Sequence, residues 1–501
     1  RRGPESVSQS SSKLFKMTIP PRSCCCLSKL QCYVCTIALS SILVGYSVGI
    51  ISGILVFLRP PHYPTTHPLS LTPRQDEILA SSIMLGAAIG ALLIGPVYDS
   101  YGRRFALLFA SVVFLLSTFI QTVALTYLVL LVGRSINGLA VGAFMLIAPT
   151  FIAELAPGDT RGALVNAHEL GISLGICVSF VANIFFTLPL FGGPQMAWRW
   201  MYGVQGLPCV LLMGGCLFVL PESPRYLIRR GTPLELQQAK QIVTETSIDP
   251  KVVADTLQAI KTSVAEEGNQ GWRSACGADG HRALFVYGLL LGMFQQFVGV
   301  DSLIMYTPDI LQASGFVATS EQGMFGVLAL GGVKLLTEVV VLFFIDRVGR
   351  RPLLLVGGGI LVVCNIGLGV LLRFSAVEKN AGGGGVEGGT SVVSLFVFLL
   401  ILVYTSAFAF SWGSVCWIVV SEMFPLSIRG KGVGVVVVGN RLMSFAVSHT
   451  FVSIGVATGN VGTPFFMYGA LALIGFVFVY VVLPETKDVA LEQVPLLWKK
   501  K

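Results

Sequence analysis

The sequence predicts an all-α membrane protein in which twelve transmembrane helices form two pseudo-symmetric six-helix bundles. Only 12% of its 501 residues are charged and 54% are hydrophobic, whereas about 25% of the residues of a soluble domain are charged. Apolar runs of about 20 residues, long enough to cross a hydrocarbon core about 30 Å thick as a helix, recur along the chain. Short charged signals of the first half also return in the second half. Such duplication is typical of secondary transporters.

The repeated signals keep the same order in both halves. The first is Asp-x-x-Gly-Arg-Arg, the second is a Glu followed seven residues later by Arg-Gly, and the third is Pro-Glu followed by Ser or Thr. The matching residues are Asp99 and Asp346, Glu154 and Glu422, Arg161 and Arg429, and Glu222 and Glu485, which are 247 to 268 residues apart. This spacing indicates one ancestral unit used twice.

Composition divides the chain into five parts. We expect a disordered tail at 1–31, a six-helix bundle at 32–220, a helical linker at 221–282, a second bundle at 283–484 and a tail at 485–501. The expected spans are 32–58, 78–98, two within 105–153 that separate near Thr126, 162–188, 198–220, 283–312, 322–345, 352–372, 392–420, 432–457 and 462–483. Gly45, Gly49 and Gly53 recur at a spacing of four in the first span and predict close contact with another helix.

The positive charges are distributed unevenly around the spans. Sixteen Lys and Arg residues fall in the loops on the side of Asp99 and four in the loops on the opposite side. This asymmetry predicts that the Asp99 side and both termini are cytoplasmic. It also accounts for the net charge of +8 without a nucleic-acid partner. We expect a monomer in the plasma membrane.

Most of the cysteines lie in apolar runs and are interpreted as small core residues rather than as a disulfide framework. Cys32 and Cys35 form a C-x-x-C pair without further metal ligands nearby, so no metal site is expected there. Cys24, Cys25 and Cys26 precede the first span, where palmitoylation is an open alternative to plain free thiols.

The charged signals are interpreted as latches on the cytoplasmic side. Guanidinium groups hold carboxylates through paired hydrogen bonds, so salt bridges there can tie the two halves together and release them again. The candidate latch residues are Asp99, Arg103, Arg104, Glu154, Arg161, Glu222, Arg225, Asp346, Arg350, Arg351, Glu422 and Arg429. The alternative is that the arginines only orient the chain at the lipid headgroups.

These motifs together resemble the sugar porter family of the major facilitator superfamily, from about Leu39 to Gln493. The resemblance implies a carrier that alternates between outward and inward openings around a central hexose site. Gln295-Gln296-Phe-Val-Gly-Val-Asp301 is similar to the family's sugar-binding Gln-Gln-x-x-Gly-x-Asn, with Asp in place of the final Asn. The other implied contacts are Trp412, Trp417, Asn440 and Glu169, of which Glu169 stands where many members have Gln.

The same residues suit a sugar on chemical grounds alone. Amides donate and accept hydrogen bonds toward hydroxyl groups, and an indole face covers the apolar surface of a sugar ring. Polar side chains in apolar helices are costly unless they are paired. The alternative is that they only bond neighbouring helices.

Whether transport is coupled to protons depends on ionisable groups inside the spans. In proton-linked members of the family that the chain resembles, an Asp in the first span works with an Arg at the position of Arg134. Here that position is Ser47, which favours facilitated diffusion. Glu169 and Asp301 keep a proton symporter open as an alternative. Lys334 and Glu338 lie four residues apart in one span, and a mutual salt bridge is the simpler explanation for them.

The sequence therefore predicts a carrier of a monosaccharide, most simply a hexose, that works by facilitated diffusion. A proton-coupled sugar or polyol symporter is the first alternative and a non-transporting sugar sensor is the second. No cofactor is expected. An enzyme is not expected either, since the soluble segments show no nucleophile, metal cluster or phosphate loop.

Overall fold

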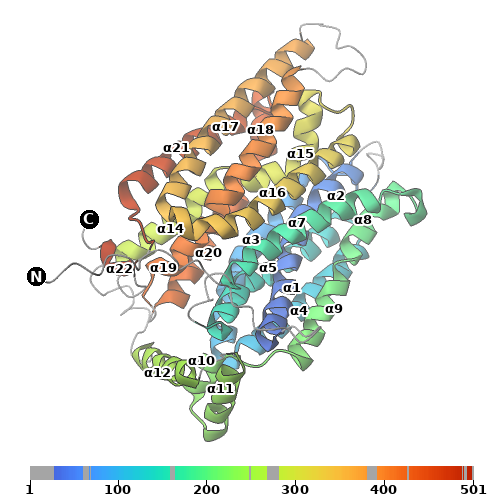
Figure 1. Ribbon diagram of the computed structural model, residues 1–501. Coiled ribbons are helices and arrows are strands. Elements are labelled where there is room, and N and C mark those ends of the chain that lie inside the picture. Colours follow the sequence, from blue (N-terminus) through green and yellow to red (C-terminus); the bar gives the residue numbers. More distant parts are fainter. Residues whose placement is uncertain are drawn as a thin grey trace, which may run out of the picture.

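The computed structural model is a bundle of long helices (Figure 1). It describes residues 28–59, 67, 69–157, 164–246, 250–267, 281–380, 392–425, 428–487, 489 and 494–498. Twelve helices or runs of consecutive helices in these ranges are long and apolar enough to cross a membrane, as predicted. Arg161, the three cysteines before the first span and the side chain of Asp346 lie outside the described residues.

The first half contains six of these spans. Their helices are α1 (Lys29–Gly49) with α2 (Ile51–Phe57), α3 (Pro73–Tyr101), α4 (Arg103–Thr122), α5 (Tyr127–Leu155), α7 (Ala167–Phe185), and α8 (Pro194–Gly203) with α9 (Gly206–Phe218), and the short η1 (Pro189–Phe191) precedes α8. Three helices of the linker follow, namely α10 (Pro224–Arg230), α11 (Pro233–Thr246) and α12 (Pro250–Glu267).

The second half contains the other six spans. They are α14 (His281–Phe297) with α15 (Val300–Ser314), α16 (Ser320–Val348), α17 (Arg350–Asn380), α18 (Val392–Phe408) with η2 (Ala409–Gly413) and α19 (Ser414–Met423), α20 (Arg429–Thr458), and α21 (Thr463–Val482). A short helix, α22 (Val494–Leu497), follows.

Local capping decides where several helices begin. The predicted break inside 105–153 is confirmed, because α4 ends at Thr122 and the Thr126 hydroxyl accepts a hydrogen bond from Val129 N at the start of α5. The first helix begins earlier than predicted, at Lys29, since Ser28 and Gln31 cap it reciprocally. The expected tail up to residue 31 is therefore wrong at its last three residues, 29–31.

The glycines at spacing four in the first span allow α1 and α2 to lie against α7, as predicted. A Cβ on Gly45 would stand 1.9 Å from the carbonyl oxygen of Ile172, and one on Gly49 would stand 2.2 Å from Ser179 Oγ. Gly53 is equally close to Asn183. The absence of side chains at these positions therefore sets the distance between the helices.

Figure 1 shows the first half, blue to green, packed along the second half, yellow to red. Helix α3 runs against α20, and α7 runs against α16. The linker helices α10–α12 lie together at one end of the bundle, which we call the linker face. The opposite end, which carries α2 and the start of α3, is called the far face. The charge asymmetry predicts that the linker face is cytoplasmic.

We predict that Gly45→Ala lowers the thermal unfolding midpoint of the purified protein. The new methyl group must push α1 and α7 apart, and such overpacking costs about 1–3 kcal/mol. The matched control is Gly214→Ala in α9, where an added Cβ meets no atom within 4 Å. Equal midpoints for the two variants would contradict the close contact.

Candidate functional site

The seventh span is broken at its centre, between α14 and α15. Gly299 adopts a positive φ of 91°, and a Cβ there would collide with the ring of Tyr468. The break frees the carbonyl oxygen of Val298, which accepts hydrogen bonds from Tyr404 Oη at 2.7 Å and from Asn365 Nδ2 at 3.2 Å. Side chains of two neighbouring spans thus replace the hydrogen bonds that the helix loses.

A second irregularity, the π-helical turn η2, lies opposite the break in the tenth span. Gln295 Nε2, in the last turn of α14, donates to the carbonyl oxygens of Trp412 at 2.9 Å and Gly413 at 3.2 Å. Gln295 is 3% exposed, so its side chain does not face lipid. The amide of this predicted site residue is thus already engaged by the backbone of η2.

Asn440, at the middle of α20, joins the same group. It is fully buried, and its Nδ2 donates to Gln295 Oε1 at 2.6 Å and to the carbonyl oxygen of Gly292 at 2.8 Å. Its Oδ1 accepts from the Nε of Arg441 at 2.9 Å. The structure thus brings together amide groups that are 145 residues apart in the sequence.

A buried pair of charges completes the group. Arg441 Nη1 lies 4.0 Å from Asp301 Oδ2, and the Ser444 hydroxyl donates to the same carboxylate oxygen. In the orientation that satisfies both ends of its amide, Gln296 donates to Asp301 Oδ2 at 3.1 Å and accepts from Arg441 Nη2 at 2.7 Å. We call this set the central network; its members are Gln295, Gln296, Asp301, Asn440, Arg441 and Ser444.

Arg441 also links the central network to the first half. Its Nη1 lies 3.6 Å from the sulfur of Met84 in α3. The sequence analysis did not include Arg441 in the site. The available signal was one more arginine in an apolar helix, next to the predicted Asn440.

The two tryptophans of the tenth span differ in their surroundings. Trp412 is 1% exposed, and its indole N–H donates to the carbonyl oxygen of Leu354 at 3.1 Å. Its side chain therefore packs between spans, while its backbone carbonyl meets Gln295. Trp417 is half-buried against the core, and its indole N–H makes no hydrogen bond among the described residues. Trp417 is thus the better placed of the two to meet a ligand.

Glu169 lies in a separate charged group between α7 and α16. Lys334 Nζ forms a salt bridge with Glu338 Oε1 at 2.5 Å, as predicted, and also donates to the Ser173 hydroxyl. Glu169 lies one turn before Ser173 on α7 and interacts electrostatically with Glu338, Lys334 and Arg441. One ammonium group therefore faces two carboxylates.

Ser47 and Arg134, the other candidates for coupling, are direct neighbours. Arg134 Nη1 donates to the carbonyl oxygen of Ser47 at 2.8 Å, and the Ser47 hydroxyl donates to Gln205 Oε1 at 3.1 Å. These contacts lie within the first half, away from the central network.

The Gly-Arg-Arg signals begin helices at the linker face. Gly102 has a φ of 94°, and Glu222 Oε1 accepts hydrogen bonds from the backbone N–H groups of Arg103 at 2.8 Å and Arg104 at 3.3 Å. Burial raises the pKa of the Glu222 carboxyl, while the hydrogen bonds from the backbone N–H groups of Ser223, Arg103 and Arg104 lower it. A carboxylate thus caps the N-terminus of α4.

The second half repeats this arrangement. Gly349 has a φ of 101°, and the Glu485 carboxylate accepts from the backbone N–H groups of Arg350 and Arg351 at 3.0 Å each. Lys487 N donates to the same carboxylate at 2.9 Å. The two Pro-Glu signals therefore act in the same way, which explains why they repeat together with Gly-Arg-Arg.

The first arginine of each signal pairs with a carboxylate of its own half. Arg103 binds both oxygens of Glu154, at 2.7 Å from Nε and 2.8 Å from Nη2. Arg350 Nη2 lies 3.2 Å from Glu422 Oε1. Both pairs tie neighbouring spans within one half, whereas the sequence analysis expected salt bridges on this side to tie the two halves together.

The second arginine of each signal caps the end of a helix. Arg104 donates to the carbonyl oxygens of Cys216 and Leu217 at the end of α9. Arg351 Nη2 donates to the carbonyl oxygen of Tyr480 near the end of α21, at 2.7 Å. Of the remaining latch residues that the structure describes, Asp99 binds the exposed Arg229, Arg225 interacts electrostatically with Glu154, and Arg429 donates to the carbonyl oxygen of Phe424.

Charged side chains also connect the two halves at the far face. Arg59 binds Asp76 of α3 at 2.5 Å and Asp309 of α15 at 2.7 Å. The Glu77 carboxylate accepts hydrogen bonds from the backbone N–H and the hydroxyl of Ser453 in α20. We call these five residues the far-face network. The sequence analysis assigned Arg59 no role and missed this connection.

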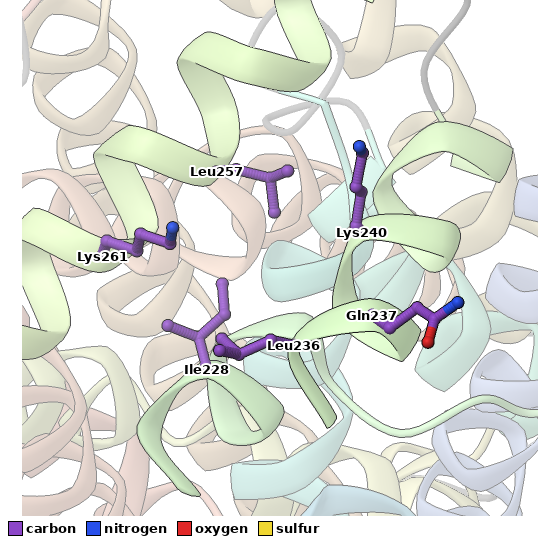
Figure 2. Close-up of a pocket in the computed structure, with 6 residues that line it drawn as sticks. All are labelled: Ile228, Leu236, Gln237, Lys240, Leu257 and Lys261. Atoms are coloured by element: carbon purple, nitrogen blue, oxygen red, sulfur yellow. The ribbon is translucent and has the colours of Figure 1, made fainter. Parts of the chain in front are cut away.

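A groove of about 320 Å³ lies on the linker helices and is lined by Ile228, Leu236, Gln237, Lys240, Leu257 and Lys261 (Figure 2). Its walls come from α10, α11 and α12, so it contains no member of the central network. We assign it no part in transport, because it lies on the linker helices and not among the spans.

Solved structures with the same fold are known. The chain superposes on the proton:xylose symporter XylE bound to 6-bromo-6-deoxy-D-glucose with a TM-score of 0.76 and 27% identity, over 94% of this chain and 99% of that one. An inward-open structure of the xylose transporter XylE from E. coli gives a TM-score of 0.71 and 26% identity, over 93% and 99% of the two chains. The fold is thus that of a transporter of the major facilitator superfamily.

Sequence comparison identifies the family. The model of the sugar (and other) transporter family matches residues 33–498. A probable polyol transporter 4 of Arabidopsis thaliana is 31% identical over 92% of this chain and 84% of its own length. A D-xylose transporter of Levilactobacillus brevis is 30% identical over 91% and 93% of the two chains. The chain belongs to the family of sugar (and other) transporters, as the motifs indicated.

We predict that Glu154→Gln lowers the thermal unfolding midpoint clearly. Arg103 is 6% exposed in this pair, and removal of one partner of a buried salt bridge costs about 3–5 kcal/mol. The matched control is Asp99→Asn, because Asp99 and its partner Arg229 are 60% and 43% exposed and such pairs contribute about 0–1 kcal/mol. A larger loss from Asp99→Asn than from Glu154→Gln would contradict the structural role of the Arg103 pair.

Proposed function

We propose that the protein carries a small polyhydroxylated solute, either a linear polyol or a monosaccharide, across the membrane by alternating access. The central network supports this proposal, because six polar side chains that converge at the middle of the spans are costly in a bilayer unless they serve a function. Hydroxyl groups of a solute can form hydrogen bonds with each of these side chains, since every hydroxyl both donates and accepts hydrogen bonds.

The proposed binding mode follows from the chemistry of the central network. The amides of Gln296 and Asn440 present donors and acceptors, Asp301 presents only acceptors and Arg441 only donors. A polyol supplies all the complementary groups along one short chain. Trp417, with its half-buried indole, is the proposed apolar wall for the carbon skeleton.

The names of the relatives guide the choice of solute. Curated relatives are called polyol transporters and D-xylose transporters, and the XylE structure holds a bromodeoxyglucose. We therefore place linear polyols and aldopentoses first and keep hexoses, which the motifs suggested, as the next class. Counterflow into proteoliposomes with labelled sorbitol, xylose, glucose and inositol separates these classes. Lack of exchange with all of them, by protein of confirmed thermal stability, would refute the proposal.

We predict that Gln296→Ala raises the KM for the transported solute about tenfold or more. The variant leaves hydroxyl groups of the solute and the pair of Asp301 and Arg441 without their amide partner, and an unpaired buried polar group costs about 1–3 kcal/mol. Gln258→Ala on the exposed surface of α12 is the matched control and should keep the original KM. An unchanged KM for Gln296→Ala would place the site elsewhere.

We also propose that transport is coupled to protons through Glu169. The sequence favoured facilitated diffusion because Ser47 replaces the usual aspartate, but relatives are named D-xylose-proton symporter-like 3 and proton:xylose symporter. Glu169 supports coupling, because it shares the ammonium of Lys334 with Glu338 and the excess negative charge of this group is neutralised when a proton binds. Its link to Arg441 connects this group to the central network.

We predict that a proton gradient, with the outside more acidic than the lumen, drives solute accumulation in proteoliposomes that contain the unmodified protein. Glu169→Gln should abolish this accumulation and keep counterflow, because the amide holds the neutral state without a titrating proton. Asp255→Asn, at an exposed position of α12, is the matched control and should still accumulate solute. If the gradient has no effect on the unmodified protein, facilitated diffusion is correct and coupling through Glu169 is wrong.

The cytoplasmic position of the linker face belongs to the same proposal. The pairs of Arg103 with Glu154 and Arg350 with Glu422 each lie within one half and would make that half rigid, so that the two halves rock as units. We place the protein in the plasma membrane as a monomer. A sensor without transport would bind the solute but fail in counterflow.

A further inference from the structure

Arg134 is a buried cation without an anionic partner. It is 0% exposed in the first third of the fourth span, and one of its nitrogens, Nη1, donates to the carbonyl oxygen of Ser47. Its Nε and Nη2 have no hydrogen-bond partner among the described residues. Such a charge is strongly unfavourable in a protein interior unless it is compensated.

Further unused donors converge on the same point. Gln205 Oε1 accepts from the Ser47 hydroxyl, so the Gln205 amide and the Arg134 guanidinium meet at Ser47. The Gln205 amide nitrogen has no partner among the described residues, and neither has the hydroxyl of Tyr202, which interacts electrostatically with Arg134. Both side chains are buried. These four residues form the Arg134 site.

No carboxylate of the described chain neutralises this site. Among the described residues, the interaction with Tyr202 is the one electrostatic interaction that acts on the guanidinium. Unpaired acceptors nearby come from neutral amides, namely Gln121 Oε1 and Asn137 Oδ1. An amide oxygen can accept one of the N–H groups but leaves the positive charge in place. The site therefore has several donors, one full charge and no anion of its own.

We propose that the Arg134 site binds a small monovalent anion of the halide type, with chloride as the common case. The guanidinium supplies charge and two free nitrogens, and the Tyr202 hydroxyl and the Gln205 amide supply further donors. A halide accepts several hydrogen bonds from any direction and neutralises the charge that no side chain here compensates. The anion is a structural ligand between α1, α5 and the sixth span, independent of the solute in the central network.

Thermal unfolding of the purified full-length chain tests this site. The midpoint is measured in sodium chloride, sodium bromide and sodium methanesulfonate at equal ionic strength. Chloride and bromide should raise it saturably, because a ligand that binds only the folded state stabilises that state. Methanesulfonate is a larger monovalent anion without hydroxyl groups, so it does not resemble the proposed solute, and it should not raise the midpoint. If chloride and methanesulfonate give the same midpoint at all concentrations, the Arg134 site does not select a halide and the proposal is wrong.

Variants of Ser47 locate the effect. Ser47→Asp supplies a carboxylate beside the guanidinium, so its midpoint should no longer depend on chloride. Ser47→Asn has the same shape without the charge and should keep the dependence. Equal chloride responses of Ser47→Asp and the unmodified protein would show that the anion binds elsewhere.

A direct measurement covers the case in which Ser47→Asp does not fold. Crystals of the unmodified chain grown in sodium bromide should give an anomalous scattering peak beside the Arg134 guanidinium. Bromide peaks only at other positions would overturn the proposal. Neither readout uses transport, so the failure of this site and the failure of the proposed function are distinguishable.

Discussion

The structure depends on one constraint, which is that a backbone group inside a bilayer has no water to replace a lost hydrogen bond. Each irregular turn of a span must therefore be matched by a side chain from another span. Tyr404 and Asn365 satisfy the carbonyl oxygen of Val298 at the break of the seventh span, and Gln295 satisfies the π-helical turn of the tenth. The irregular turns and the polar side chains of the central network consequently occur at the same place.

The same constraint explains how charges are distributed in the spans. Asp301 and Arg441 lie together, and so do Lys334 and Glu338, because an isolated charge is expensive in an apolar medium. The excess carboxylate at Glu169 and the excess guanidinium at Arg134 depart from this rule at two different positions. We propose that a proton neutralises the carboxylate of Glu169 and that a bound anion neutralises the guanidinium of Arg134. These are the two ligands that we propose in addition to the solute.

The contacts at the two faces suggest how the halves move. At the linker face, carboxylates cap helices and pair with arginines inside each half, so each half is held as a unit. At the far face, Arg59 and Glu77 connect the first half to the second through charge-assisted hydrogen bonds. Where these charged groups are exposed, they can form hydrogen bonds with water in place of one another. Rocking of two rigid halves about the central network requires that the far-face network opens while the pairs of the linker face persist.

The sequence alone determined the class of protein, the number of spans and most of the residues of the central network. Hydrophobic length and repeated motifs are local properties, and each is visible without coordinates. Only the tertiary structure decided that Arg441 joins Asp301, that the indole of Trp412 faces Leu354 and that Glu222 caps α4. These contacts join residues far apart in the sequence. The direction in which a side chain points within a helix bundle depends on packing between spans, which no single segment specifies.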